Sequence, residues 1–364
     1  MKKQLKIPYI WFGGKRTVAS KVWEALGDVD NYIEPFFGGG AVYLLRPHEP
    51  KMEIINDMDG FVSNFWRAVQ NAPEKLAEWM YYPVNEVDLE ARHRYLCKQP
   101  DKDDFLERLK HDPDFYDVKK AGWWCWGLNA WIGAGWCQGN YYPEDHDKST
   151  GRGVCKGANN LPKISAGGQG VNVQRPHISS HCQGVHCKRP HISHAGHGVH
   201  AGTPDSTAKT LGRHEARAEL LKDWMLALRD RLRETRVCCG DWSRVCTDGA
   251  MSHGKTVGVF LDPPYSDEAN RTEEIYTVDS LTVAHEVREW CKKYGGEERY
   301  RIALCGYDTE HAELEEIGWR VYEWKTQGGY ANFAKENEQG KINKGRETIW
   351  FSPYCLADKQ RVLF

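Results

Sequence analysis

Short apolar runs alternate with longer amphipathic stretches along most of this chain. The apolar runs predict strands at Tyr32-Ile33, Met52–Ile55, Val257–Leu261, Arg301–Leu304, Arg320–Trp324 and Thr348–Phe351. Helical spacing predicts helices between them, such as Ala216–Glu234 and Thr282–Lys293. This alternation is typical of a doubly wound α/β sheet. Because such sheets bind ligands at the carboxyl ends of their strands, the residues after each run are candidate site residues.

The run Val257–Leu261 leads directly into Asp262-Pro263-Pro264-Tyr265. The carboxylate of Asp262 and the carbonyl of Pro263, whose direction two proline rings restrict, can accept both hydrogens of an amino group on a flat ring. Tyr265 can stack on that ring. These two acceptors favour a pyramidal amine whose lone pair can attack. A turn seldom needs this tetrapeptide at the end of an apolar strand, so these four residues are the predicted catalytic loop.

A second candidate site follows the run at Tyr32-Ile33. Residues Glu34 to Gly40 predict a glycine turn before a helix, where a ligand can approach the backbone closely. Asp57 lies after the next strand, about 20 residues beyond the glycines, a spacing at which a carboxylate contacts ribose hydroxyls. It could instead cap the helix predicted from Asp59 to Gln70. Nicotinamide and flavin enzymes share this pattern, but together with the Asp262 loop it indicates S-adenosylmethionine.

These motifs resemble those of the D12 class of DNA adenine-N6 methyltransferases, in which the cofactor motif precedes the catalytic motif. The similar segments are Trp11-Phe12-Gly13-Gly14-Lys15, Glu34 to Gly40, Asn56-Asp57, Gly240-Asp241-Trp242, Asp262 to Tyr265 and Cys305-Gly306-Tyr307-Asp308. The resemblance implies S-adenosylmethionine as cofactor, no metal requirement, and cofactor contacts from Trp11, Lys15, Glu34, Phe36, Gly38, Gly40, Asp57, Asp241 and Asp262. Two of these have ordinary alternatives, because Lys15 could be a surface lysine and Asp241 a turn residue.

The resemblance also implies a domain organisation and a reaction. A Rossmann-like catalytic domain would comprise residues 1–75 and 236–364, and an inserted, mainly helical target-recognition domain residues 76–235. The expected partner is double-stranded DNA, whose target adenine is flipped into the pocket before methyl transfer to N6. RNA adenine-N6 and DNA cytosine-N4 methylation remain alternatives, as does a DNA-binding protein with a vestigial catalytic core.

The net charge of −2 gives no overall attraction to nucleic acid, so a DNA-binding surface must be local. Residues 147–213 carry nine basic and two acidic side chains, a formal charge of +7. Three fourteen-residue copies align there: Leu161–Gln174, Arg175–Lys188 and Arg189–Gly202. We interpret this segment as a basic insertion that contacts DNA phosphates, with Arg175, Lys188 and Arg189 as candidates. Since phosphate contacts carry no sequence information, short or relaxed specificity is expected.

Histidine and cysteine crowd the second and third copies, which suggests zinc. The first copy has other residues at the corresponding positions, so the favoured interpretation is a polar loop enriched in histidine by duplication, with no metal. Before the insertion, Gly122 to Cys137 is rich in tryptophan. Core packing of the smaller domain is the favoured role for most of these rings. The alternative is that one or two rings and Asn129 face DNA.

The sequence shows no signal peptide and no run that could span a bilayer. The expected location is therefore the cytoplasm, and scattered cysteines are expected to be reduced thiols. We expect a monomer without an obligatory protein partner. A viral or mobile-element origin would suit a modification enzyme that acts without a partner nuclease.

Overall fold

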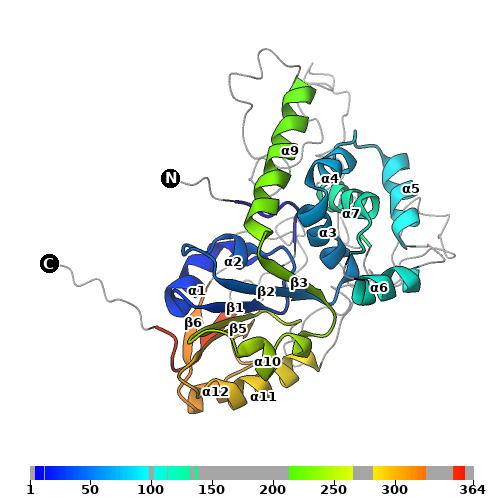
Figure 1. Cartoon of the computed structure of the whole chain (residues 1–364). Helices are drawn as coiled ribbons and strands as arrows, with labels where there is room; N and C mark the ends of the chain where they lie inside the picture. Colours follow the sequence, from blue (N-terminus) through cyan, green and yellow to red (C-terminus); the bar gives the residue numbers. More distant parts are fainter. Residues whose placement is uncertain are drawn as a thin grey trace, which may run out of the picture.

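The computed structural model describes residues 5–11, 13–97, 102–112, 114–131, 136–137, 213–264, 282–324 and 347–356. These residues contain a seven-stranded sheet of order β3-β2-β1-β4-β5-β7-β6 (Figure 1). The strands are β1 (Asn31–Glu34), β2 (Met52–Asp57), β3 (Thr235–Cys239), β4 (Val257–Leu261), β5 (Tyr300–Tyr307), β6 (Arg320–Glu323) and β7 (Glu347–Phe351). Strands β1 to β5 are parallel, and β7 pairs antiparallel with β5 and β6. The predicted doubly wound, Rossmann-like fold is confirmed.

The strand order changes direction between β1 and β4. From β1 the sheet continues through β2 to β3 on one side, and from β4 it continues to β5 on the other. Ile33 of β1 lies opposite Val259 of β4, so both strands end at the same edge of the sheet. Such a reversal opens a crevice beyond the carboxyl ends of the strands. The loops after β1 and β4 therefore meet at the place where this fold binds ligands.

Helices cover both faces of the sheet (Figure 1). One face carries α1 (Ala19–Leu26) and α2 (Ala41–Leu44), and the other carries α10 (Asp248–Met251), α11 (Val283–Tyr294) and α12 (Glu313–Glu316). Successive strand residues point to opposite faces. Accordingly, Tyr32 and Phe260 belong to the core beneath α1, whereas Ile33 and Val259 belong to the core beneath α11. The sheet is thus buried on both sides, which explains why β1 and β4 are buried throughout.

A group of helices gathers beside the β3 end of the sheet (Figure 1). These are α3 (Gly60–Asn71), α4 (Pro73–Met80), α5 (Glu86–Cys97), α6 (Lys102–His111), α7 (Val118–Ala130) and α9 (Arg213–Leu232). Helix α7 packs against α3, α4 and α5. Its Trp124 and Trp126 are buried, and so is Trp136, in agreement with core packing for most of the tryptophan-rich segment. The boundaries of the two predicted domains stay a prediction.

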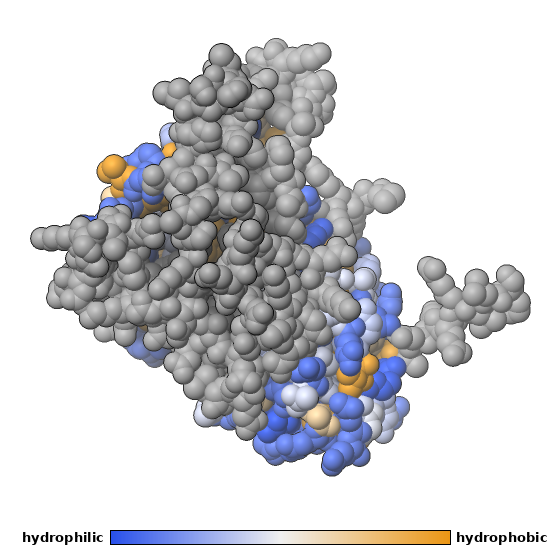
Figure 2. Space-filling model, turned by 180° about the vertical axis from the view of Figure 1, so that it is seen from behind, coloured by the Kyte–Doolittle hydropathy of each residue, from blue (hydrophilic) through white to orange (hydrophobic). Residues whose placement is uncertain are grey.

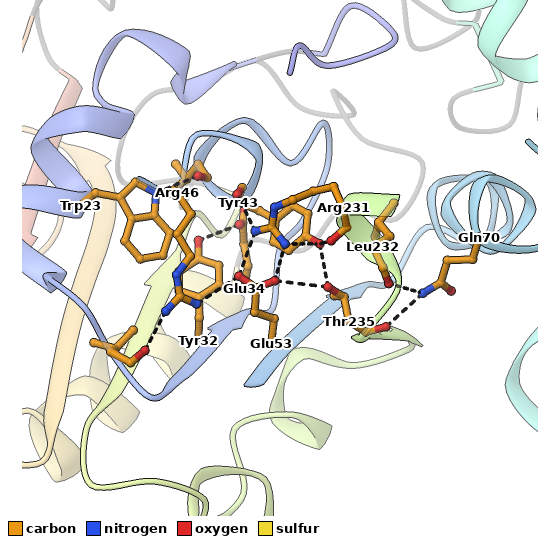
Figure 3. A network of polar contacts seen from close by, with 12 residues as sticks. Trp23, Tyr32, Glu34, Tyr43, Arg46, Glu53, Gln70, Arg231, Leu232 and Thr235 are labelled. Carbon is orange, nitrogen blue, oxygen red and sulfur yellow. Dashed lines mark hydrogen bonds and ion pairs between the residues drawn. The ribbon is translucent and has the colours of Figure 1, made fainter. Parts of the chain in front are cut away.

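A buried polar network ties the end of α9 to the sheet (Figure 3). Arg231 pairs with Glu53 of β2, with 2.9 Å between Nη2 and Oε1, and its guanidinium lies 3.8 Å from the ring centre of Tyr43 on α2. Arg46 approaches the same carboxylate at 3.0 Å. Glu53 is 2 % exposed, so two guanidinium groups share one carboxylate away from water.

The junction between α9 and β3 has a second anchor. The side-chain amide of Gln70 on α3 donates to the carbonyl groups of Leu232 and Thr235, at 3.0 Å in each case (Figure 3). The hydroxyl of Thr235 is 2.6 Å from that of Tyr43. The chain therefore leaves the helical region and enters the sheet at a fixed position.

Among the described residues, no helix has the length and apolar character needed to cross a membrane. Where Figure 2 shows described residues, the surface is mainly hydrophilic, with hydrophobic residues in small scattered patches. Single exposed apolar side chains such as Val87 and Ile317 are ordinary on a protein surface.

Candidate active site

An open cavity lies where the loops after β1, β2, β3 and β4 meet. It contains about 1060 Å³ of empty space when the open solvent at its mouth is included. Ten of the predicted site residues line it: Trp11, Lys15, Glu34, Phe36, Gly38, Gly40, Asp57, Asp241, Asp262 and Pro264. The structure thus brings the predicted cofactor turn and the predicted catalytic loop to one cavity.

The glycines of the turn after β1 form one wall of this cavity and place no side chain there. Gly38 and Gly40 have φ of 48° and 66°, in the region that favours glycine. A Cβ atom at Gly38 would lie 2.3 Å from Nε1 of Trp11. The amide of Gly38 donates to Asp57 at 2.8 Å, and its carbonyl accepts from the hydroxyl of Tyr9 at 2.6 Å. The turn is held from both sides in a shape that admits no side chain.

Asp57 ends β2 and faces the same cavity. One carboxylate oxygen accepts from the amide of Gly38, and the other accepts from the amide of Asp59 at 2.9 Å. The carboxylate has a further lone pair for a ligand hydroxyl. Burial, together with the charge of Asp59, raises the pKa of Asp57 to about 7. The cap of α3 is Asp59, which accepts from the amide of Phe61 at 2.8 Å, so the alternative role proposed for Asp57 belongs to its neighbour.

Lys15 lies in the short helix η1 (Lys15–Thr17) and is 4 % exposed. Its Nζ is 2.9 Å from Oδ1 of Asp262 and 3.7 Å from Oε2 of Glu347 on β7, and it donates to the carbonyl of Gly13 at 2.9 Å. Burial disfavours the charged ammonium, but the two carboxylates outweigh this and raise the pKa of Lys15 well above its usual value. Lys15 is therefore a fixed cation that holds Asp262 of the predicted catalytic loop.

Most of the charged side chains in the wall of the cavity are carboxyl groups. They belong to Glu34, Asp57, Asp59, Asp241 and Asp262, against Lys15 as the cationic side chain among the described lining residues. Burial and the negative charge of Asp262 raise the pKa of Glu34 well above its usual range, although Tyr32 donates to it at 2.7 Å. A positively charged ligand would relieve this repulsion. The electrostatics of the cavity favour a cation.

Two aromatic rings, those of Phe36 and Trp242, also line the cavity. The rings of Phe36 and Trp242 stack at an interplanar angle of 26°, with centroids 6.3 Å apart. Trp242 opens the short helix η4 (Trp242–Arg244), whose N-cap Asp241 accepts from the amide of Ser243 at 2.9 Å. Asp241 is thus a turn residue that also lines the cavity. A planar heterocycle can lie against these rings, with Asp241 within reach of its polar edge.

Comparison with known families agrees with this geometry. Residues 11–120 match the family model of D12 class N6 adenine-specific DNA methyltransferases. The predicted resemblance is confirmed over these residues. The matched segment contains Trp11, Lys15, the glycine turn and Asp57, while Asp241 and the Asp262 loop lie beyond it. The structure connects the two, because the segment that matches the family model and the Asp262 loop line the same cavity.

Two curated relatives are type II methyltransferases. The chain is 36% identical over 122 residues to the type II methyltransferase M.MjaIII of Methanocaldococcus jannaschii, a match covering 30% of this chain and 40% of that protein. It is 28% identical over 101 residues to the type II methyltransferase M1.LlaDCHI of Lactococcus lactis subsp. cremoris, covering 27% and 34% respectively. The chain therefore spans less than half of the length of each of these relatives.

Some predicted residues lie elsewhere. Pro263 is buried and is not among the residues that line the cavity. Tyr265, Arg175, Lys188 and Arg189 fall outside the described residues. Asn129 sits on α7, where its amide donates to the carbonyls of Pro8 at 3.1 Å and Cys125 at 2.9 Å. Contact of Asn129 with DNA stays a prediction.

Two residues at the site were not singled out from the sequence. The sequence shows Glu347 as an acid at the start of an apolar run. Its pairing with Lys15, however, depends on where β7 joins the sheet. Trp242 stood in a weak motif without a role of its own. Its stacking on Phe36 depends on the loops after β1 and β3 ending at the same edge of the sheet.

Proposed function

We propose that this chain transfers a methyl group from S-adenosylmethionine to the N6 amino group of adenine in double-stranded DNA. The observation that carries the proposal is the shared cavity of the glycine turn, Asp57 and the Asp262 loop. The D12 family match over residues 11–120 and the similarity to two type II methyltransferases support it.

The lining residues fit S-adenosylmethionine on three counts. Asp57 offers a carboxylate at the strand end where ribose hydroxyls are commonly bound, and the rings of Phe36 and Trp242 offer a wall for the adenine. The acidic lining suits a cation. When bound, the cofactor supplies a methyl group on a positively charged sulfur, which is activated for attack by an amine.

The protein's own residues then position the acceptor. Asp262 accepts one hydrogen of the adenine amino group and the Pro263 carbonyl accepts the other, which directs the lone pair of N6 outward. Lys15, paired with Asp262 at 2.9 Å, fixes the direction of that carboxylate. Because an adenine inside a duplex cannot reach the cavity, the base must be flipped out at a cost of a few kcal/mol.

The Asp262→Ala variant tests the catalytic assignment. Loss of a hydrogen-bond acceptor that orients the nucleophile is expected to lower methyl transfer by at least about 10²-fold. Transfer of labelled methyl to DNA measures the loss, and calorimetric titration with S-adenosylmethionine should show that binding persists. The matched control is Asp230→Asn, an exposed acid of α9 whose side chain is 66% accessible and does not line the cavity. Unimpaired transfer by Asp262→Ala would refute the role of Asp262.

The acceptor is identified by nucleoside analysis of the methylated product. We expect N6-methyladenine from duplex DNA, whereas N4-methylcytosine or a product found only in RNA would replace the proposed acceptor. Wild-type protein that binds DNA but neither binds S-adenosylmethionine nor transfers methyl would instead support a vestigial catalytic core. We further propose short or relaxed sequence specificity. A long, strict motif among methylated sites after expression in an unmethylated host would overturn that part.

The proposal includes a cellular location and an oligomeric state. A modification enzyme of this kind would act on DNA in the cytoplasm of a bacterial or phage-infected cell. We propose a monomer without an obligatory protein partner. Size-exclusion chromatography with light scattering of the DNA-free protein measures the oligomeric state.

A further inference from the structure

A cluster of one histidine and two cysteines lies in the helical region, away from the active-site cavity. His93 and Cys97 are four residues apart on α5 and therefore lie on one face of that helix. Cys137, which follows α7 in the chain, completes the group. The ligand atoms of the three side chains lie within 4.8 Å of one another. His93 and Cys137 are buried, at 1 % and 4 % exposure.

The position of Cys137 is fixed by its neighbour Trp136. The Trp136 ring lies so close to Gly127 of α7 that a Cβ atom there would come within 1.9 Å of it. Its indole N–H donates to the carbonyl of Trp124 at 3.0 Å. Cys137 has φ of 56°, and among the described residues no other non-glycine residue has a positive φ. Such strained backbone persists where surrounding structure enforces it and is common at functional sites.

His93 is held in the state that a metal ligand requires. The backbone amide of Cys137 donates to its Nε2 at 3.1 Å, so this nitrogen presents a lone pair and carries no proton. The ring also stacks on Trp136 at 21°, with centroids 4.9 Å apart. Its lone pair thus points toward the residue that carries the second thiol. An ion at the cluster would take that lone pair in exchange for one neutral hydrogen bond.

We propose that His93, Cys97 and Cys137 bind a zinc ion. Two sulfur atoms and one imidazole form a soft donor set that suits zinc, whereas magnesium and calcium prefer oxygen ligands. Both thiols lose their protons on binding, and imidazole contributes its neutral lone pair. Tetrahedral zinc takes a fourth ligand, which this cluster does not supply. The site departs from the expectation of no metal, and it is separate from the histidine-rich repeats.

The ion would act as a cross-link. Helix α5 supplies two ligands, and the third comes from the segment that follows α7 and precedes the basic insertion. Binding would therefore fasten the segment that contains Cys137 to α5. The methyl-transfer residues are not involved, so the site goes beyond the proposed function and can be tested independently of it.

The test is metal content of the full-length protein, purified without chelators after growth with zinc. We expect about one zinc per chain by elemental mass spectrometry, and visible absorption of thiolate-bound tetrahedral cobalt after exchange. Cys97→Ser and Cys137→Ser should each lower zinc content at least tenfold. The matched control combines Cys182→Ser with Cys187→Ser in the repeats and should retain zinc.

A rescue variant separates ligand loss from misfolding. Cys97→His keeps a metal-binding side chain on the same helix face and should keep zinc, while Cys97→Ser should not. Circular dichroism checks the fold of each variant. The proposal is overturned if the wild-type protein holds less than about a tenth of an equivalent and gives no cobalt spectrum. It is equally overturned if the repeat variant loses the zinc and the cluster variants keep it.

Discussion

Asp57 links the shape of the glycine turn to the charge of the cavity, and its titration should be visible in cofactor binding. Burial and Asp59 raise its pKa to about 7, so its protonated and ionised forms are both populated near neutral pH. Ribose hydroxyls donate to the ionised form, and a sulfonium also favours it. Affinity for S-adenosylmethionine should therefore be low below pH 7, rise through that region and level off above it.

Calorimetric titration across this range measures the effect. If the protonated form does not bind, affinity changes by up to about tenfold per pH unit below the pKa. Binding near pH 7 should release protons, which buffers with different ionisation enthalpies reveal. Asp57→Asn should bind weakly with a flat profile, whereas Asp241→Asn should keep the wild-type pH dependence. A wild-type affinity that is constant from about pH 6 to pH 8 would rule out Asp57 as the titrating group.

At the scale of residues, the sequence was informative wherever a motif is local. Gly38, Asp57 and Asp262 each lie within five residues of the end of an apolar run, and each lines the cavity. Contacts that depend on strand order could not be read in this way. Lys15 meets Asp262 and Glu347 only because β4, β5 and β7 lie side by side in the sheet, and their order is not encoded in any single segment.

At the scale of elements, the apolar runs located six of the seven strands. Val257–Leu261 was predicted at its observed bounds, because a strand buried on both faces is a continuous apolar run. Strand β3 (Thr235–Cys239) was not predicted. It lies at the edge of the sheet, and Arg236 within it is exposed. Its apolar pattern is therefore weak, and it follows so closely on α9 that the predicted helix Ala216–Glu234 runs up to its first residue.

The anchor of α9 predicts a measurable stability difference. Glu53→Gln leaves the buried guanidinium groups of Arg46 and Arg231 without their shared carboxylate (Figure 3). Removing one member of such a buried set should lower the free energy of unfolding by about 3–5 kcal/mol. Urea denaturation followed by circular dichroism measures it. The control is Glu313→Gln, whose pairing with Lys292 is exposed and should contribute less than about 1 kcal/mol. Equal losses in both variants would exclude a special role for Glu53.

At the scale of the whole molecule, charge is unevenly distributed. The chain carries −2 overall while residues 147–213 carry +7, so the remainder is net negative. Among the described charged residues that line the cavity, five are acidic and one is basic. A surface of that sign repels DNA phosphates at long range, although it suits a cationic cofactor. Attraction of DNA must therefore come from elsewhere in the chain, and the basic insertion is the strongest candidate in the sequence.

Removal of the three repeats from Leu161 to Gly202 tests this division of roles. The segment contains four basic and no acidic residues. Its loss should weaken DNA binding. It should also reduce the slope of log K against log salt concentration by up to about 3 to 4 in magnitude, since each phosphate contact contributes about 0.9 to that slope. Affinity for S-adenosylmethionine should not change. Fluorescence anisotropy with duplex DNA at several salt concentrations gives the slope.

Two full-length variants distinguish the effect of the basic side chains from the effect of the length of the repeats. Replacing Lys163, Arg175, Lys188 and Arg189 by glutamine keeps the length and should reproduce the smaller slope, because the repeats would act through phosphate neutralisation. Replacing the histidines and cysteines of the repeats by serine should leave the slope near the wild-type value. If the glutamine variant keeps the full salt dependence, the repeats do not contact phosphates, and the negative surface around the cavity must be overcome by basic residues outside them.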